Sequence, residues 1–256
     1  MSQQSDFERF KNLSFEDFKK LATEDSLSKY QKIGFPDSYR KDKEDAIFLD
    51  IVHKLNIEPD KDNEQGILLD IGPGCSELPF MILNLCQKAN LKALLVDSQE
   101  MLDHLPSEKY IEKYPGYFPD DVPALVNEYQ NKVKYIIGYS IFHYVFYNTC
   151  IFKFLDVAVS LLKPGGKLLI GDIPNISKRK RFFSTETGIA YHKAFTNTDT
   201  LPEVKHLQPE PTHIDDGVLM GIIQRYRGFG FEAYLLPQPD TLPMYNRRED
   251  LLIQKI

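Results

Sequence analysis

The residues best suited to chemistry in this chain of 256 residues form one short stretch, Asp70-Ile71-Gly72-Pro73-Gly74. It follows the apolar run 66–69, and this order is typical of a buried strand, a tight turn and the start of a helix. Gly72 and Gly74 let the backbone approach a ligand where a Cβ would collide. The unpaired N–H groups of the following helix carry a partial positive charge. The stretch therefore predicts a binding corner for a nucleotide-like ligand.

A second carboxylate, Asp97, ends the next apolar run, Ala93–Val96. At the tip of a neighbouring strand, such a side chain can accept hydrogen bonds from both hydroxyls of a ribose. The dinucleotide fingerprint Gly-x-Gly-x-x-Gly does not fit well, because its last position is Glu77. A carboxylate there would lie near a pyrophosphate, which disfavours NAD(P) without removing it as an alternative.

Strands and helices must alternate to bring these residues together. Apolar runs and turn residues predict an α/β fold with a doubly wound, mostly parallel, seven-stranded sheet and an antiparallel terminal strand. Helices are expected near 15–21, 41–55, 77–86, 148–162 and 215–226. Strands are expected at 66–71, 93–97, 111–114, 133–137, 167–171, 231–236 and 250–255.

The chain is expected to form a single domain, 1–256, with four parts. These are a helical N-terminal cap (1–60), a binding core (66–172), an insertion after the fifth strand (173–213), and a C-terminal helix with a strand pair (214–256). The insertion is polar, contains several prolines and shows little periodicity. A long loop of this kind is usually functional, so we expect a lid on the substrate side.

Four features occur in an order that resembles class I S-adenosylmethionine-dependent methyltransferases. They are Asp70–Gly74, Asp97, Leu162-Lys163-Pro164-Gly165-Gly166 before the fifth strand, and the closing strand pair. Together they cover about residues 66–256. The resemblance implies S-adenosylmethionine as the methyl donor and S-adenosylhomocysteine as the product. The chain departs from the family pattern at Ser76, where glycine is frequent.

The resemblance also implies roles for individual residues. Asp97 would bind the ribose, with Ser98 beside the adenosine and Met101 packed on its ring. Gly72, Pro73 and Gly74 would admit the methionine portion, and Asp70 would lie near its ammonium group. Asp120 is a candidate for the adenine amino group. Tyr139 and Ser140 would face the end that donates the methyl group.

The acceptor side offers three histidines as candidate general bases: His143, His192 and His213. His213 precedes Asp215 and Asp216, which could orient its imidazole. The basic run 178–181 is either a solvated face or a site for a phosphate or carboxylate of the substrate. Each histidine also has the simpler interpretation of an ordinary surface or core residue.

Composition narrows the class of partner. A net charge of −6 argues against nucleic acid bound through its phosphates. The three cysteines are scattered without metal-ligand spacing, which predicts reduced thiols, no metal and a cytoplasmic location. Cys75, at a helix start, is either a thiol of lowered pKa or a packed, inert one. No signal peptide and no membrane-spanning run is expected. Oligomeric state is not determined.

These observations predict an enzyme that transfers a methyl group to a small polar acceptor. The favoured acceptor atom is an oxygen of a sugar, a nucleotide-sugar or a phosphorylated metabolite. Two alternatives stay open: an NAD(P)-dependent Rossmann-type oxidoreductase, and a non-catalytic partner subunit that binds S-adenosylmethionine.

Overall fold

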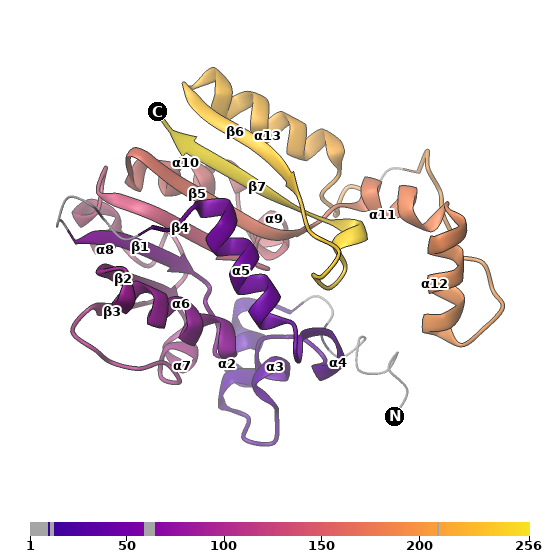
Figure 1. Cartoon of the computed structure of the whole chain (residues 1–256), viewed down its shortest axis with the longest axis horizontal. Helices are drawn as coiled ribbons and strands as arrows, with labels where there is room; N and C mark the ends of the chain where they lie inside the picture. Colours follow the sequence, from indigo (N-terminus) through magenta and orange to yellow (C-terminus); the bar gives the residue numbers. More distant parts are fainter. Residues whose placement is uncertain (1–9, 11–12, 59–64, 209) are drawn as a thin grey trace.

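Seven strands form one sheet in the order β3-β2-β1-β4-β5-β7-β6, and only β7 runs antiparallel to its neighbours. The computed structural model describes residues 10, 13–58, 65–208 and 210–256, and Figure 1 shows the strands side by side, with helices in front of the sheet and behind it. This confirms the predicted fold class. The strands are β1 (Gly66–Ile71), β2 (Leu91–Asp97), β3 (Ile111–Pro115), β4 (Val133–Tyr139), β5 (Leu162–Pro174), β6 (Phe231–Pro237) and β7 (Arg248–Lys255).

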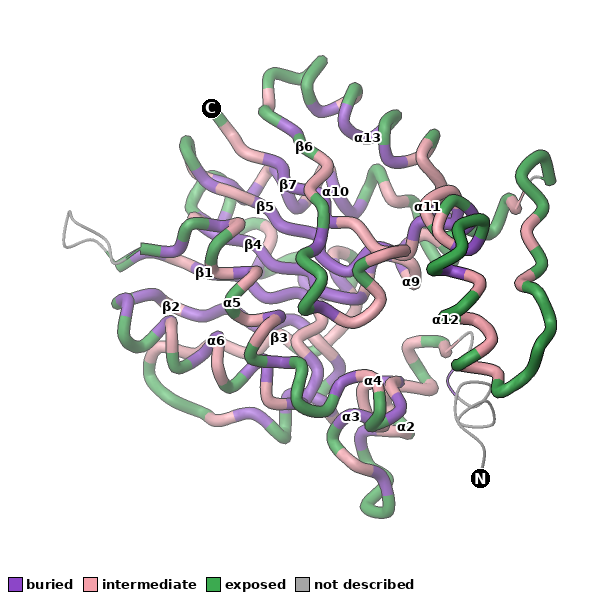
Figure 2. The backbone as a smooth tube through the Cα atoms, turned by 45° about the vertical axis from the view of Figure 1, so that its right-hand side comes forward, coloured by how far each residue is buried: buried purple, intermediate pink, exposed green. Residues whose placement is uncertain are grey.

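The central strands β1, β2 and β4 are mainly apolar because helices cover both faces of the sheet. One core joins the sheet to α5 (Glu44–Leu55), α6 (Glu77–Lys88) and α7 (Gln99–Leu102). The other joins it to α8 (Pro123–Glu128), α9 (Phe142–Asn148), α10 (Ile151–Leu161) and α13 (Asp216–Gly228). The central strands are accordingly buried throughout, as Figure 2 shows.

Three short helices precede α5: α2 (Phe15–Thr23), α3 (Lys29–Lys32) and α4 (Asp37–Arg40). The capping box that begins α2 is formed by Ser14 and Asp17, as their spacing predicts. A second box, Ser28 with Gln31, begins α3. The polar composition of residues 56–65 predicts a linker, most of which lies outside the described residues.

The predicted helix 148–162 is confirmed as α10, which begins at Ile151 because the chain is extended at Thr149 and Cys150. The helix α9, which ends before this break, was not predicted. One expected element differs from the structure. The expected turn 163–166 lies inside β5, where the pairing with β4 shifts register between Val133 and Tyr135. A bulge absorbs the extra residues without ending the strand.

The expectation of a loop at 173–213 is wrong for its first half, which forms α11 (Ile176–Phe183) and α12 (Glu186–Thr196). Their N-terminal caps, Asn175 and Thr185, are the sequence signal for these helices. Both helices stand away from the sheet at the right of Figure 1, and α12 is largely exposed in Figure 2. The weak apolar periodicity follows from this exposure, since α12 has no sheet face to cover.

A buried ion pair ties α5 to the antiparallel part of the sheet. The side chain of Asp250 is fully inaccessible, and its Oδ2 lies 2.6 Å from Lys54 Nζ. The backbone N–H of Asp172 and the amide of Gln238 also donate hydrogen bonds to Asp250. Burial nonetheless raises the pKa of Asp250 to about 6, with Lys54 opposing the rise. Removal of Lys54 would leave a buried charge without its partner.

We expect Lys54→Met to lower the free energy of unfolding by about 3–5 kcal/mol, the usual cost of breaking a buried pair from one side. Without Lys54, the buried carboxyl of Asp250 is tolerated at pH 5.5, where it is mostly protonated, but is a buried unpaired charge at pH 8. The loss of unfolding free energy is therefore expected to be larger at pH 8 than at pH 5.5. Urea unfolding at both pH values measures it. Lys153→Met, which removes an exposed partner of Asp120, is the matched control and is expected to change little. Equal losses in the two variants would contradict the buried pair's importance.

None of the helices in the described part of the chain combines the length and the apolar character needed to cross a bilayer.

Candidate active site

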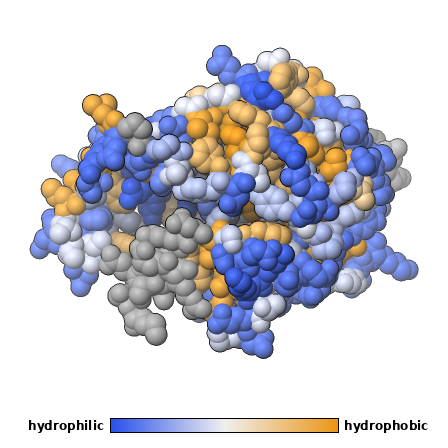
Figure 3. Space-filling view, turned by 180° about the vertical axis from the view of Figure 1, so that it is seen from behind, coloured by the Kyte–Doolittle hydropathy of each residue, from blue (hydrophilic) through white to orange (hydrophobic). Residues whose placement is uncertain are grey.

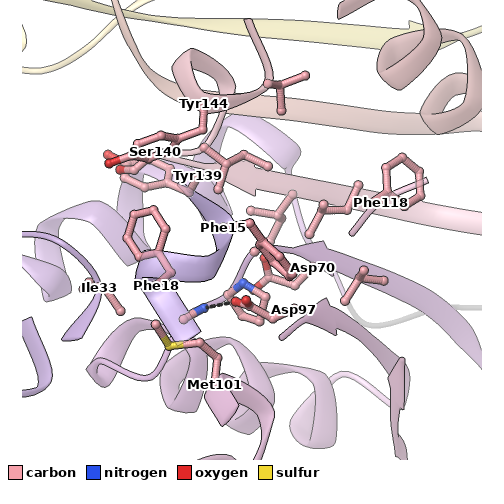
Figure 4. A pocket seen from close by; sticks show the side chains of 18 of the residues that line it. Phe15, Phe18, Ile33, Asp70, Asp97, Met101, Phe118, Tyr139, Ser140 and Tyr144 are labelled. Atoms are coloured by element: carbon pink, nitrogen blue, oxygen red, sulfur yellow. Dashed lines mark hydrogen bonds between the residues drawn. The ribbon is translucent and has the colours of Figure 1, made fainter. Parts of the chain in front are cut away.

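A deep pocket opens at the carboxyl ends of β1, β2 and β4, where the strand order reverses direction. Open α/β sheets bind their ligands at this switch point. The space between the pocket walls, including open solvent at the mouth, is about 1120 Å³. Figure 4 shows Asp70, Asp97 and Met101 on one side and Tyr139, Ser140 and Tyr144 on the other.

The corner after β1 has the positive φ angles that its two glycines predict. Gly72 has φ 72° and Gly74 has φ 66°, values that side chains rarely adopt. A Cβ on Gly72 would lie 2.7 Å from Ile141 Cγ2, and one on Gly74 would lie 2.6 Å from Ile33 Cγ2. Pro73 lines the same pocket. Only glycine therefore fits both positions.

Glu77, the residue that weakened the dinucleotide interpretation, is turned away from this corner. It accepts a hydrogen bond from the Tyr30 hydroxyl at 2.5 Å and forms an ion pair with Lys29. Both partners belong to the N-terminal cap. Ser76, at the position where glycine is frequent in the family, is buried at the start of α6.

Two carboxylates meet in the pocket at the tips of β1 and β2. Asp97 accepts hydrogen bonds from the N–H of Gly74 (3.0 Å) and of Ser98 (2.7 Å), the first of which is dashed in Figure 4. Burial raises its pKa to about 6, although those two bonds oppose the rise. Burial, and then the charge of Asp97, raise the pKa of Asp70 to about 8. No described residue donates a hydrogen bond to the carboxylate of Asp70, so the site suits a cationic ligand group.

Most of the other expected cofactor residues line the pocket, and two of them, Ser98 and Asp120, do not. Met101, Tyr139 and Ser140 line the pocket, as do Gly72, Pro73 and Gly74. Ser98 lies just behind it and caps α7. Asp120 does not line it: its side chain pairs with Lys153 at the surface, and Gly116, Tyr117 and Phe118 of the same loop face the pocket instead. The structure thus gives no support to Asp120 as an adenine ligand.

At Cys75, burial affects the pKa of the thiol more than the nearby start of a helix does. Its side chain packs with Ala22 and Met101. Burial raises the pKa of its thiol to about 11, so the packed, inert interpretation holds over the reactive one.

An aromatic lid from α2 closes the mouth, and sequence reasoning did not assign it to the site. Phe15 packs edge-on against Tyr117 at 5.3 Å between ring centroids. Phe18 packs edge-on against Tyr144 at 5.1 Å. Both phenylalanines line the pocket, as Figure 4 shows. Their shared helical face was visible in the sequence, but what that face covers was not.

A chain of polar contacts leads from the pocket into the sheet. Ser140, with φ 60°, donates a hydrogen bond to Asp172 Oδ2 at 2.7 Å. Arg40 Nη1 lies 3.4 Å from the same hydroxyl oxygen. Arg40 also pairs at 3.0 Å with Glu44, which caps the N–H of Leu78 in α6. The two ends of the pocket are therefore joined through Arg40.

The three histidines do not form a base in this pocket, since none of them lines it. Burial lowers the pKa of His143 to about 3, and its Nδ1 has no hydrogen-bond partner in the described structure. His192 packs edge-on against Phe183 on the projecting helices. His213 faces Glu210 at 3.8 Å. The expected orientation of His213 by Asp215 and Asp216 is wrong, because Asp215 caps α13 and Asp216 pairs with Arg181.

No family model and no curated protein matches this sequence. Solved structures do match. The CurJ carbon methyltransferase aligns with a TM-score of 0.56 and 14% identity, covering 98% of this chain and 67% of that one. The plantazolicin methyltransferase BpumL, solved in complex with SAH, aligns at 0.54 and 11%, covering 98% and 100%. A Haloferax volcanii methyltransferase in complex with the Trm112 activator aligns at 0.50 and 12%, covering 93% and 97%.

The chain therefore has the fold of the class I S-adenosylmethionine-dependent methyltransferases, as the four sequence features predicted. Within the described residues, no group of three or more His, Cys, Asp or Glu side chains is placed to hold a metal ion.

The pair Asp70–Asp97 predicts that a cationic ligand displaces a proton when it binds. Asp70, with a pKa of about 8 in the free protein, is protonated at pH 7, and a cation favours its ionised form. The affinity for S-adenosylhomocysteine, whose ammonium group is cationic, should rise by up to about tenfold per pH unit between pH 6.5 and 8.

Calorimetric titration in buffers of different ionisation enthalpy measures the released proton. Asp70→Asn keeps the shape of the side chain and should remove both the proton release and the pH dependence. Identical heats for the original protein in all buffers would contradict the prediction.

Proposed function

We propose that this protein is an S-adenosylmethionine-dependent methyltransferase that acts on a small molecule. The observation that carries the proposal is the joint position of Asp97, Asp70 and the Gly72–Gly74 corner in one pocket at the switch point. These residues suit a ligand with a ribose diol, an ammonium group and a chain that passes close to the protein backbone. The methyltransferase folds of the matching structures support the proposal.

Each of these residues would contact a different part of S-adenosylmethionine. Asp97 accepts hydrogen bonds from the ribose hydroxyls, in exchange for its present bond to Gly74. Asp70 faces the ammonium group, and the glycine corner admits the methionine portion. Met101 and the loop Gly116–Phe118 would lie on either side of the adenine. The complex of BpumL with SAH is consistent with this use of the pocket.

S-adenosylmethionine supplies a methyl group on a sulfonium, which is itself a good leaving group. The protein has to align the acceptor atom, exclude water and accept a proton where the acceptor carries one. Phe15 and Phe18 close the mouth against water. Ser140, held by Asp172 and Arg40, offers a hydroxyl oxygen toward the pocket for orienting the acceptor.

The acceptor is a small molecule with a flat or apolar part. Phe15, Phe18, Tyr117 and Tyr144 line the mouth, and aromatic faces favour such a group. This aromatic lining contacts the flat or apolar part of the acceptor and does not choose among the acceptors considered from the sequence. Oxygen remains the proposed target atom. The three free cysteines suit a cytoplasmic location.

Asp97→Ala is expected to weaken S-adenosylhomocysteine binding about 100-fold, because two charge-assisted hydrogen bonds are lost. Calorimetric titration measures the affinity. Asp103→Ala, an exposed carboxylate one helical turn away that accepts only from Gln99, is the charge-matched control and should bind normally.

The same titration separates the alternatives. Absence of S-adenosylhomocysteine binding together with thermal stabilisation by NAD(P) would establish the oxidoreductase. Binding without transfer of label from methyl-tritiated S-adenosylmethionine to any member of a panel of small phosphates and carboxylic acids would favour the non-catalytic subunit.

Ser140→Ala is expected to lower kcat for an accepted substrate at least tenfold while S-adenosylhomocysteine affinity stays within twofold. Ser160→Ala, whose hydroxyl bonds only to the carbonyl of Val157, serves as the control. A loss in cofactor affinity equal to the loss in kcat would show that Ser140 acts on the cofactor rather than on the acceptor.

A further inference from the structure

Two arginines near the pocket lack an acidic partner. Arg179 lies on α11, and Arg247 lies in η1 (Tyr245–Arg247), the short helix before β7. Their guanidinium carbons lie 5.1 and 5.9 Å from the ring centroid of Phe183. Among the residues that the structure describes, no carboxylate lies within 4 Å of either guanidinium. The two positive charges thus contact one aromatic ring without neutralisation by a carboxylate.

The other basic residues of this region are all paired, which sets the two arginines apart. Lys180 lies 2.7 Å from Glu210, and Arg181 pairs with Asp216. Lys178 donates to the carbonyl of Arg248 and lies 3.9 Å from Glu249. The run 178–181 is therefore mostly structural, and its one open charge is Arg179.

Tyrosine hydroxyls complete the surroundings of Arg247. Its Nη2 donates to the hydroxyl oxygens of Tyr191 (3.3 Å) and Tyr39 (3.5 Å). Burial raises the pKa of Tyr39 to about 12, and its hydroxyl is also hydrogen-bonded to that of Tyr191. Two guanidinium groups close together, without a carboxylate partner, suit the binding of an oxyanion.

This cluster adjoins the acceptor end of the pocket through the backbone on both sides. Tyr39 precedes Arg40, which lines the pocket. Arg247 precedes Arg248, whose Nε is buried without a hydrogen bond and lies 3.6 Å from Asp172. Asp172 in turn binds Ser140. The cluster therefore lies beyond the polar end of the pocket, on the side away from Asp97. Figure 1 shows that α11 and the segment before β7 meet at this end of the sheet.

We propose that Arg179 and Arg247 bind an anionic group of the methyl acceptor, a phosphate or a carboxylate, so that the substrate is a small acid. This inference rests on the proposed function and names the substrate class for the same site. The arginines hold the acid group at the outer end, the aromatic lid covers the middle, and the acceptor atom faces Ser140. Guanidinium groups bind oxyanions through charge-assisted hydrogen bonds. Arg247 Nη1 also donates to the side-chain oxygen of Asn246 at 3.1 Å, which helps to hold its guanidinium group in place.

The experiment titrates phenyl phosphate and benzoate into the full-length protein, with and without saturating S-adenosylhomocysteine, and measures heat. We expect at least one probe to bind, and Arg179→Gln and Arg247→Gln each to weaken that binding at least tenfold. The stronger probe identifies the preferred acid group. Lys193→Gln removes one positive charge from α12, where the lysine has only a loose contact with Asp199 at 3.8 Å, and should stay within twofold.

The proposal would be overturned if neither phenyl phosphate nor benzoate binds. It would also be overturned if all three variants weaken probe binding equally, because that result would show a general effect of charge. S-adenosylhomocysteine affinity is expected to be unchanged in every variant. If S-adenosylhomocysteine fails to bind the original protein while the probes still bind through the two arginines, the methyltransferase proposal falls and the anion site stands. Melting temperatures exclude misfolded variants.

Seen from behind, apolar and hydrophilic side chains are mixed over the visible surface of the described residues (Figure 3). Among the exposed aromatic residues, Phe152 and Phe229 contact Arg225, which is paired with Asp156.

Discussion

The structure depends on keeping two carboxylates close together in a largely apolar pocket. Asp70 and Asp97 end adjacent parallel strands, so their side chains meet at one edge of the sheet. Burial and mutual repulsion disfavour their ionisation. The N–H of Gly74 relieves part of this cost for Asp97, which requires the backbone turn that only glycine permits. An unfavourable arrangement of this kind is retained where a ligand uses it.

A second set of buried charges supports the pocket from behind. Arg40 joins Glu44 to Ser140, and Asp172 joins Ser140 to the strand that carries Asp250. Through Glu44 the set also caps α6, the helix that begins at the glycine corner. Polar networks of this kind are costly unless every member is satisfied, so they fix one arrangement of the elements that they join. The N-terminal cap and the sheet are therefore held in one register around the pocket.

Much of the fold could be predicted because its signals are local. Apolar runs that end in an acid or glycine marked β1, β2, β4 and β5, and the short β3 was found near its true bounds. The helices α11 and α12 were missed because an exposed helix carries little apolar periodicity, and only the caps Asn175 and Thr185 indicate where they begin. The helix α9 was also missed, and no glycine or proline marks its end before Thr149.

The sequence by itself determined the sheet, the glycine corner and the two carboxylates, since spacing along parallel strands dictates which ends meet. Only the tertiary structure decided the acceptor side. It removed the histidines from the pocket and turned Asp120 to the surface. It paired the lysines and Arg181, leaving Arg179 and Arg247 open. These outcomes depend on contacts between segments far apart in the chain, such as Arg247 with Tyr39, and no local pattern encodes such contacts.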